Sequence, residues 1–542
     1  MDGPTGKVYW RERIGGEDLR SPVRAGNRLY CIAHAGEMLV LAAATQSEPL
    51  GRSKMGDQSN RAPAIAGGVM HLRTLRHLRA LDSKYLGCHH RWMKKRIAFS
   101  LALFLSLVSA AWAADAYGGM RIESAKAEKN TIRVSSTGAE FIFNLPTRGI
   151  DLVQRIPQRR QVGKIVGLDL KGAKLKVEGD QCRITIPATR TVFTISADSL
   201  LRISLASPAT VEVQGLYTPA TKANVTNCFF LPDETGGIGL YPVGSVTAQA
   251  PGRWKAPWSI PFRFNESGQL WVSVFPPRPF DWAQAREGML HSFSWKNPYP
   301  SDEQLKEWRK LGSVLTLHSW IWQGTNGSNA RVEKDDSWLQ RDFKPKSAEE
   351  LTRVTKTAHR LKMKVIPYMS AYYQSDPTPA GREKFVKQIE RAHQVYGFDG
   401  VYFDGICYDI PASYELMRQV RKVFGKEGIL HIHVTGVPRI CCPFIECYAD
   451  YTLRDEHARL SKDYIRWTVS GWNMSNSIGM TCYDRTRPSQ TLIETMLAAH
   501  ARLPIWVDDG TWDGAAYYLS APELKLMEDE YLPRLQAEKE SR

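Results

Sequence analysis

The stretch GFDGVYFDG, residues 397–405, lies between a strongly helical pattern and a loop. Its first four residues turn the chain out of a helix, the next three form a buried strand, and Asp404 ends that strand before a glycine. In a parallel helix–strand fold the functional end is the carboxyl end of the strand. We therefore expect Asp404 to face a site, and Asp399 to lie at the opposite, stabilising end.

The same alternation of helix and strand extends in both directions from this stretch. Ser301 is predicted to cap one helix, and Ser347 with Glu350 forms a predicted capping box at the next. Seven apolar strands are expected after residue 312, and residues 269–277, QLWVSVFPP, are a candidate for the first of eight. Eight such units predict a (β/α)8 TIM barrel over residues 291–542.

Residues 114–290 show a different pattern. Apolar and polar residues alternate in segments such as TIRVSSTGAEFIFNLP, between turns of Gly, Pro and Asp. This period of two predicts an all-β region, which we interpret as a β-sandwich domain. Nothing in it has catalytic spacing, so we expect it to support the barrel or to bind glycan.

Carboxylates and aromatic rings dominate the expected carboxyl ends of the barrel strands. This combination suits glycoside cleavage, in which one carboxyl protonates the leaving oxygen and another attacks or stabilises the oxocarbenium-like centre. Trp and Tyr rings supply stacking faces for sugars. The candidate catalytic residues are Asp404, Asp455 and Glu456, and the candidate substrate-binding residues are His318, Trp320, Trp322, Tyr368, Tyr372, Tyr402, His433, Arg454, Trp472, Asp508 and Asp509.

The segments KVIPYMSAYY, YGFDGVYFDG and YADYTLRDEH make a family resemblance specific. They resemble a glycoside-hydrolase-like barrel family of secreted bacterial proteins, over roughly residues 120–535. The barrel also resembles the melibiase (α-galactosidase) clan. That resemblance implies Asp404 as nucleophile and Asp455 or Glu456 as acid/base, in a retaining reaction. Tyr402 stands where the clan has a lysine.

Several alternatives remain open on the sequence alone. Asp455 and Glu456 also resemble the adjacent pair of substrate-assisted N-acetylhexosaminidases, and Asp508 and Asp509 are a reserve acid/base. Trp320 and Trp322 could both face the site or both belong to the core. A metal-dependent hydrolase would use the histidines, but no metal or other cofactor is predicted. A barrel that only binds carbohydrate is the non-enzymatic alternative.

Residues 1–92 carry an internal repeat at an offset of 41 residues, which aligns Pro22 with Pro63 and Gly26 with Gly67. Each unit is a pair of strands around a Gly turn, and it resembles the PQQ-like (quinoprotein-type) β-propeller repeat. Two blades cannot close a propeller, which needs at least about four. We interpret residues 1–92 as the tail of a different protein.

Residues 93–113 resemble a secretory signal peptide. A basic start is followed by a short apolar run and an A-x-A motif that ends at Ala113. The run is shorter than the roughly 20 residues of a membrane span, so no stable span is predicted. We expect either that translation begins at Met93 or that the end of one gene is joined here to the start of the next. If translation begins at Met93, the protein is expected to be secreted or periplasmic.

The charge of the chain does not indicate nucleic acid. The net charge is +16, of which residues 1–92 contribute +6 (14 basic minus 8 acidic residues) and Lys94 to Arg96 contribute +3. The remaining +7 is dispersed among acidic residues over about 430 residues. A carbohydrate is therefore the predicted partner. Nine Cys at this length do not make a disulfide scaffold.

Overall fold

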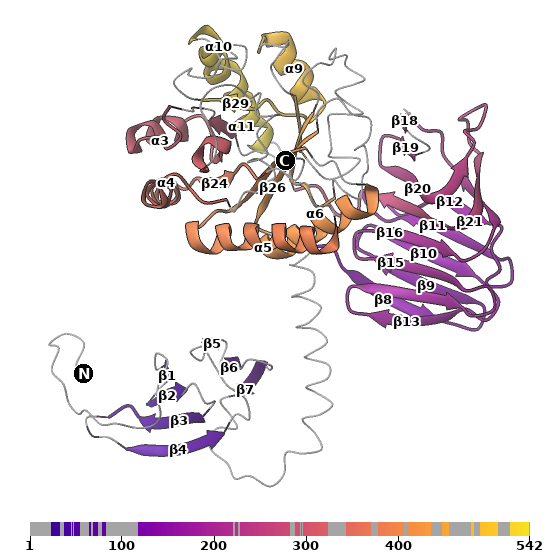
Figure 1. The fold of residues 1–542 in the computed structure, drawn as a ribbon, viewed down its shortest axis with the longest axis horizontal. Helices are drawn as coiled ribbons and strands as arrows, with labels where there is room; N and C mark the ends of the chain where they lie inside the picture. Colours follow the sequence, from indigo (N-terminus) through magenta and orange to yellow (C-terminus); the bar gives the residue numbers. More distant parts are fainter. Residues whose placement is uncertain are drawn as a thin grey trace. The chain divides into compact units, whose positions relative to one another are not determined.

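The chain of the computed structural model divides into two compact units, residues 1–105 and 106–542, which are considered separately (Figure 1). The structure describes residues 23–25, 27–32, 37–44, 46, 48–54, 64–66, 69–73, 78–82, 118–220, 223–225, 228–281, 288–292, 294, 296–323, 343–369, 378–405, 409–434, 447–454, 478–481, 488–507 and 521–540. The signal-like segment 93–113 lies outside these ranges.

The first unit holds two small antiparallel sheets, one for each sequence repeat. Both sheets join strands in chain order. The apolar core of the first sheet is small and centres on Cys31, Leu39 and Leu41. The link to PQQ-like propellers stays a prediction. The strands are β1 (Val23–Ala25), β2 (Arg28–Ile32), β3 (Glu37–Ala42) and β4 (Pro49–Lys54), then β5 (Ala64–Ala66), β6 (Val69–Arg73) and β7 (Leu78–Asp82).

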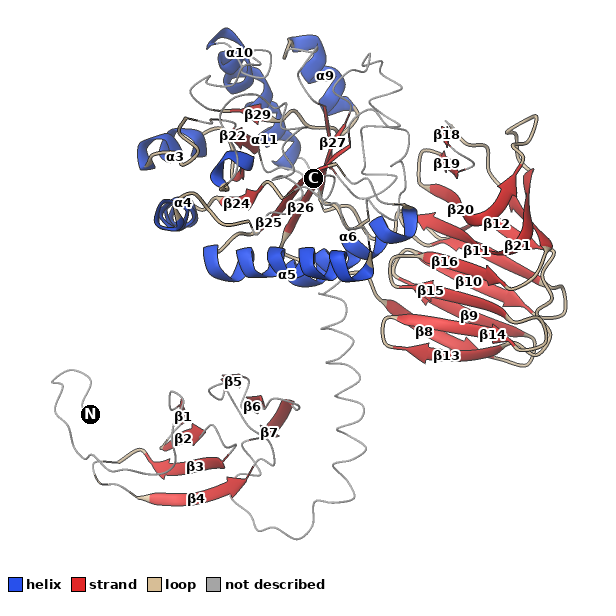
Figure 2. Cartoon of the chain, viewed as in Figure 1, coloured by secondary structure: helices blue, strands red, loops and turns tan. Residues whose placement is uncertain are grey.

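The second unit begins with a large, nearly closed antiparallel sheet in the region predicted to be a β-sandwich (Figure 2). Its strands are β8 (Ile122–Ala127), β9 (Thr131–Ser136), β10 (Ala139–Asn144), β11 (Gly149–Gln154), β12 (Arg160–Val166), β13 (Lys174–Glu178), β14 (Gln181–Ile186), β15 (Thr191–Ser196), β16 (Leu200–Leu205), β17 (Ala209–Gly215), β18 (Ala223–Val225), β19 (Cys228–Pro232), β20 (Gly237–Ala248) and β21 (Trp258–Phe275).

The order of these strands brings the two edges of the sheet together. The main path is β13-β14-β15-β16-β21-β17-β12-β11-β10-β9-β8, and β20, β19 and β18 branch from β21. The edge strands β8 and β13 contact each other. Alternate residues point inward and form one apolar core, in which Phe143 and Phe193 meet edge to face at 5.1 Å.

Eight parallel strands follow. They are β22 (Met289–Ser292), β23 (Val314–Leu317), β24 (Lys364–Pro367), β25 (Gly400–Asp404), β26 (Ile429–Val434), β27 (Tyr451–Arg454), β28 (Ile478–Thr481) and β29 (Ile505–Trp506). They form two sheets, β24-β23-β22-β29 and β25-β26-β27-β28. A parallel bridge between Tyr368 and Tyr402 links β24 to β25.

The first of these strands is not where the sequence suggested. Residues 269–275 belong to β21 and pair antiparallel with β16 and β20. The prediction of a first barrel strand at 269–277 is therefore wrong. Its place is taken by β22, which pairs parallel with β23 and with β29.

In the described ranges, helices lie between successive parallel strands from β22 to β26 and again between β28 and β29 (Figure 2). The predicted caps hold, since the Ser301 and Ser347 hydroxyls accept from Gln304 N and Glu350 N. The capping box predicted at Ser347 is incomplete, because the Glu350 carboxylate bonds Arg353 instead of the Ser347 backbone. The complete box is at Ser301, with Gln304. The helices are α3 (Asp302–Arg309), α4 (Ala348–Arg360), α5 (Pro379–Tyr396), α6 (Ile410–Phe424), α9 (Gln490–Ala498), α10 (Ala521–Leu526) and α11 (Leu532–Glu540), the last two joined by a π-helical turn.

The stretch 397–405 folds as its sequence predicts. Gly397 ends α5 in the left-handed conformation, with φ of 75°. Gly400 must lack a side chain, because a Cβ there would lie 1.8 Å from the carbonyl oxygen of Ile429. Asp399 is structural, since its carboxylate accepts from Val365 N at 2.7 Å and bonds His359 Nε2 at 2.9 Å.

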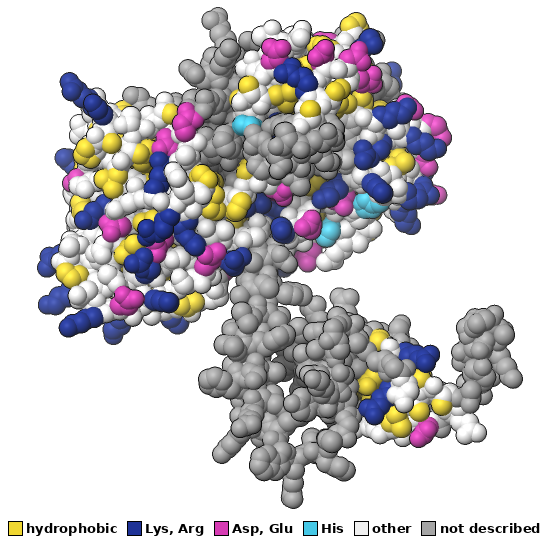
Figure 3. All heavy atoms as spheres, turned by 180° about the vertical axis from the view of Figure 1, so that it is seen from behind, with side chains coloured by type: hydrophobic (Ala, Val, Ile, Leu, Met, Phe, Trp, Pro, Cys, Tyr) yellow, Lys and Arg dark blue, Asp and Glu magenta, His cyan; other side chains and the backbone are white. Residues whose placement is uncertain are grey.

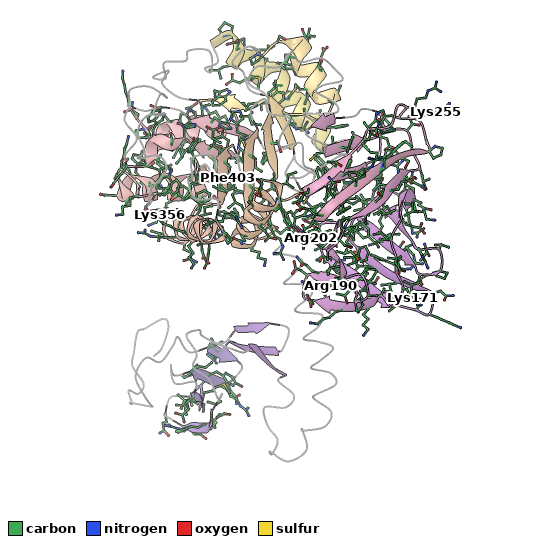
Figure 4. All side chains as sticks on the ribbon, turned by 45° about the vertical axis from the view of Figure 1, so that its right-hand side comes forward. Lys171, Arg190, Arg202, Lys255, Lys356 and Phe403 are labelled. Atoms are coloured by element: carbon green, nitrogen blue, oxygen red, sulfur yellow. The ribbon has the colours of Figure 1, made fainter. Side chains whose placement is uncertain are left out.

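Buried polar groups join the antiparallel sheet to the parallel strands. Asp450 accepts from Arg278, from Arg421 and from the backbone of Leu430. Arg202 lies over the rings of Trp271 and Tyr414, where the sheet meets α6 (Figure 4). Trp271 and Tyr414 themselves meet edge to face at 5.4 Å. The two parts of this unit therefore share one continuous core.

On the face seen in Figure 3, basic and acidic side chains of the described residues are closely mixed. Some of these charges form ion pairs, such as Lys387 with Glu383 one helical turn away. Within the described ranges, no helix has both the length and the apolar character needed to cross a membrane.

Candidate functional site

The carboxyl ends of β24, β25 and β26 converge on Asp404. Its Oδ1 lies 2.9 Å from His433 Nδ1, and its Oδ2 accepts a hydrogen bond from the Tyr368 hydroxyl at 3.1 Å. The Asp404 side chain keeps 27% of its exposure, whereas that of His433 keeps 5%. The carboxylate is thus held from two strands and is still accessible from outside.

The surroundings of Asp404 favour its ionised form. Burial alone would raise the pKa of the carboxyl, but the hydrogen bond and charge of His433 oppose this, with smaller contributions from His318 and Tyr368. The result is a pKa below the usual value for Asp. Asp404 therefore presents an anion at neutral pH, as a nucleophile or an electrostatic stabiliser requires.

Two tyrosines support this carboxylate from below. The Tyr402 hydroxyl lies 3.1 Å from His433 Nδ1, and the two rings are nearly parallel, 19° apart. Tyr368 and Tyr402 are only 2% and 1% exposed. In this structure both therefore act through their hydroxyl groups, and their predicted contact with substrate stays a prediction.

His318 follows β23 at the same end of the strands. Its ring lies 4.4 Å from that of Tyr368, and its Nδ1 is 3.1 Å from the Ser319 hydroxyl. Burial lowers the pKa of His318 to about 3, although the charge of Asp404 opposes the shift. His318 is therefore neutral over the physiological range.

One layer further toward the amino ends, four rings fill the space between the strands. We call His291, Tyr402, His431 and Trp506 the inner ring layer. The ring of His291 lies 4.6 Å from that of Trp506, 5.2 Å from that of His431 and 5.4 Å from that of Tyr402. Burial holds the pKa of His291 and of His431 well below the usual value.

The two tryptophans after β23 leave the strand. Residues Ser319–Ile321 form a 3₁₀ turn, so Trp320 and Trp322 are not strand residues. Trp322 belongs to the core, because its Nε1 donates to the Tyr368 carbonyl at 2.7 Å and its ring packs on Phe343 and Phe398. Trp320 is 2% exposed. Contact of either indole with substrate stays a prediction.

The remaining candidates cannot be placed by their side chains. Arg454 ends β27, and its backbone alone is described. Asp455, Glu456, Tyr372, Trp472, Asp508 and Asp509 lie outside the described residues. In the ranges that are described, no three His, Cys, Asp or Glu side chains are grouped to hold a metal ion.

Of the inner ring layer, the sequence predicts a role only for Tyr402, and it predicts none for His291, His431 or Trp506. His291 lies in MLHS, a four-residue strand, and His431 in HIH at 431–433. The second pattern carried a usable signal, because residues 431 and 433 point to the same side of a strand. His291 offered no such signal, since its neighbours come from distant parts of the chain.

The chain matches no protein-family model and has no significant match among curated proteins. Among solved structures it is similar to a GH36 α-galactosidase from Geobacillus stearothermophilus, at 8% identity over 96% of this chain and 86% of that one, with a TM-score of 0.40. It is also similar to an α-N-acetylgalactosaminidase from Bifidobacterium bifidum, at 8% identity over 77% of this chain and 92% of that one, with a TM-score of 0.34.

An α-amylase from Geobacillus thermoleovorans is 11% identical over 47% of this chain and 79% of that chain, with a TM-score of 0.33. These names are those of glycoside hydrolases.

Proposed function

We propose that residues 114–542 form a glycoside hydrolase in which Asp404 is the nucleophile of a retaining reaction. The observation that carries this proposal is the state of Asp404. It is a carboxyl whose pKa is lowered, it is bonded to side chains from two neighbouring strands, and it is partly exposed at the carboxyl ends of parallel strands. That is the place where active sites of parallel barrels lie.

The proposal includes a closed (β/α)8 barrel. The observed order runs from β29 through β22, β23 and β24, across the Tyr368–Tyr402 bridge, and on through β25 to β28. Eight parallel strands in this order need one further pairing, between β28 and β29, to close. The mutual contacts of rings from β22, β25, β26 and β29 support a filled interior.

Asp455 or Glu456 is the proposed acid/base. Both follow the end of β27, which is the second neighbour of β25 in the sheet. Strands lie about 4.8 Å apart, so the two strand ends are about 10 Å apart before their side chains reach toward each other. A separation of about 5–5.5 Å between carboxyl groups, as retention requires, is accessible from there.

Asp508 and Asp509 are less suited to this role. They follow β29, which is four strands away from β25 in the observed order. In an eight-stranded barrel that position is diametrically opposite Asp404, so the separation would exceed that of a retaining pair. They remain candidates for contacts with more distant sugar units.

The proposed reaction has two steps. In the first step, Asp404 Oδ attacks the anomeric carbon and the bond from this carbon to the leaving oxygen breaks, while the acid/base carboxyl gives its proton to that oxygen. The product is a glycosyl ester of Asp404. In the second step, the acid/base group, now a carboxylate, takes a proton from water, and the water oxygen displaces Asp404 from the anomeric carbon. The donors on both oxygens of Asp404 hold it in place for the first step.

The test is hydrolysis of a panel of polysaccharides and aryl glycosides by the parent, by Asp404→Asn and by Asp399→Asn. Asp399 is the matched control, since it lies at the other end of the same strand. We expect Asp404→Asn to lose activity by about 10³-fold or more, because no covalent ester can form, and Asp399→Asn to keep it. Equal activity in the parent and Asp404→Asn would overturn the assignment.

A second experiment separates an enzyme from a protein that only binds sugar. A 2-deoxy-2-fluoro glycoside with a good leaving group should label the parent covalently, and peptide mapping should place the label on Asp404. Sugar binding by the parent without turnover or labelling of any substrate would favour the binding protein. Export of the protein stays a prediction from residues 93–113.

A further inference from the structure

We propose that His433, oriented by Tyr402, is the positioning residue that fixes the Asp404 carboxylate in its reactive orientation. The catalytic meaning of this inference rests on the proposed function, but the contact does not. His433 acts through Asp404, because its side chain is only 5% exposed while that of Asp404 is 27% exposed. A substrate can reach the carboxylate and not the imidazole.

The backbone fixes the relative height of these two residues. In the parallel ladder of β25 and β26, Asp404 lies directly opposite His433. The amide of Gly405 donates to the carbonyl oxygen of His433 at 2.9 Å, which extends the pairing past the end of the strand. The contact between the side chains therefore follows from strand register and not from a mobile loop.

The charge of Asp404 determines whether Nδ1 of His433 carries a proton. An ionised carboxylate only accepts hydrogen bonds, so His433 Nδ1, at 2.9 Å from Asp404 Oδ1, must carry a proton. The Tyr402 oxygen, 3.1 Å from the same nitrogen, is then a second acceptor for that proton. Tyr402 thereby holds the imidazole in the orientation that serves Asp404.

Tyr402 is itself held by rings. It packs at 4.6 Å on His431, at 5.4 Å on His291 and at 5.7 Å on Tyr368. A chain of contacts therefore runs from the inner ring layer through Tyr402 and His433 to Asp404. On the other side, Tyr368 donates to the second oxygen of Asp404. Rotation of the carboxylate is opposed from both neighbouring strands.

The titratable groups that face this pair come from each strand packed against it. Among the described residues they are His291 from β22, His318 after β23, Tyr368 after β24, Tyr402 from β25 and His431 from β26. The three histidines in this set are buried and neutral at physiological pH. Among these groups, His433 makes the 2.9 Å contact with Asp404, so a substitution of His433 should change the titration of the Asp404 carboxyl most directly.

The test follows the Asp404 carboxyl directly in the full-length chain, labelled with [4-¹³C]aspartate. The Asp404 signal is assigned by its loss in Asp404→Asn. His433→Phe keeps a ring of similar shape and removes the donor, whereas His433→Asn keeps a donor near the Nδ1 position. We expect the carboxyl of His433→Phe to titrate about one pH unit or more above the parent, and His433→Asn to remain close to the parent.

Tyr402→Phe and His433→Gln are further variants that keep the test decisive if His433→Phe does not fold. Gln moves its amide beyond the Nδ1 position, and Phe at 402 removes the second contact of His433. Both should raise the pH at which Asp404 titrates, in the same direction as His433→Phe. An unchanged titration of Asp404 in folded His433→Phe, His433→Gln and Tyr402→Phe would overturn the proposal.

Kinetics then separate this inference from the proposed function. With a substrate in hand, His433→Phe should lower kcat by about tenfold or more, leave KM close to the parent value and move the acid limb with the carboxyl titration. A shifted titration in a protein without any hydrolytic activity would retain the positioning role and reject the hydrolase. Activity that depends on Asp404 but not on His433 would do the reverse.

Discussion

The hydroxyl of Tyr448 donates a hydrogen bond to Oδ2 of Asp198 at 2.8 Å. Asp198 lies between β15 and β16 of the antiparallel sheet, and Tyr448 lies just before β27. The carboxyl is 2% exposed, and its Oδ1 has no partner among the residues that the structure describes. Burial raises the pKa of Asp198 despite this hydrogen bond.

The first prediction is that Asp198→Asn stabilises the protein at pH 7. The fold favours the protonated form of Asp198, so its contribution is present at low pH and is lost as pH rises from the unfolded value of about 3.8. Asn keeps an acceptor for Tyr448 and carries no charge. The free energy of unfolding should rise by about 1 kcal/mol at pH 7, and by less near pH 4.

Urea unfolding followed by Trp fluorescence measures this change. Asp180→Asn is the matched control, because Asp180 bonds Arg418 and is more exposed. It should not stabilise the protein. A destabilised Asp198→Asn at pH 7 would show that the carboxylate is charged in the folded state.

The second prediction concerns Asp450, which joins Arg278 and Arg421 in the buried junction. Asp450→Asn should lower the free energy of unfolding by about 3–5 kcal/mol, since it leaves a buried guanidinium without its counter-charge. Thermal unfolding should show a correspondingly lower Tm. Asp302→Asn is the control, because Asp302 pairs with Arg353 at the surface, and it should shift Tm very little. Similar shifts in both variants would contradict the buried triad.

The third prediction is loss of stability at acid pH from the inner ring layer. The folded state depresses the pKa of His291 and of His431, so the unfolded chain binds more protons below about pH 6.5. The free energy of unfolding should therefore fall as pH drops, by about 1.4 kcal/mol per pH unit for each histidine. His431→Phe should reduce that slope by one such increment.

Urea titrations between pH 4 and pH 7 provide the slope. Thr316→Val is the control, since Thr316 is a buried residue of the adjacent β23 and carries no titratable group. Its slope should match that of the parent. If His431→Phe also matches the parent, protonation of His431 does not contribute.

The fourth prediction is the pH dependence of the proposed reaction. The pKa of Asp404 is lowered, so the group is ionised above its ordinary value of 3.8 and loses its charge only below it. The acid limb of kcat/KM that reports Asp404 should lie below about pH 4. Short assays at pH values where the protein is still folded measure it. An acid limb above pH 5 that moves in Asp404 variants would be incompatible with this site.

The sequence predicted the parts of this molecule that depend on local signals. Helix caps at Ser301 and Ser347, the glycine turn at Gly397 and the strand end at Asp404 all follow from neighbouring residues. Residues 269–275 misled because an apolar run looks the same in a buried antiparallel strand and in a parallel one. The short strand β22 has too few residues for a pattern.

The contacts around Asp404 could be predicted only in part. Asp404 and His433 were both expected at strand ends, but their pairing depends on the register of β25 against β26, which no local pattern encodes. The burial of Trp322 depends on Phe343 and Phe398, which lie elsewhere in the chain. Strand register and contacts between distant segments are therefore the features that the sequence does not predict.

The inner ring layer has a further consequence for how water and sugar reach the site. Its four rings are at most 3% exposed, and two of them, Tyr402 and His431, precede Asp404 and His433 by two residues along β25 and β26. In the proposed barrel the layer would close the space beneath the carboxylate. In the proposed reaction, water must enter by the mouth through which the sugar arrives and the leaving group departs. Any alcohol held at that mouth then competes with water for the glycosyl ester. With access closed from the side of the inner ring layer, the balance between hydrolysis and glycosyl transfer would depend only on the residues around the entrance to the site.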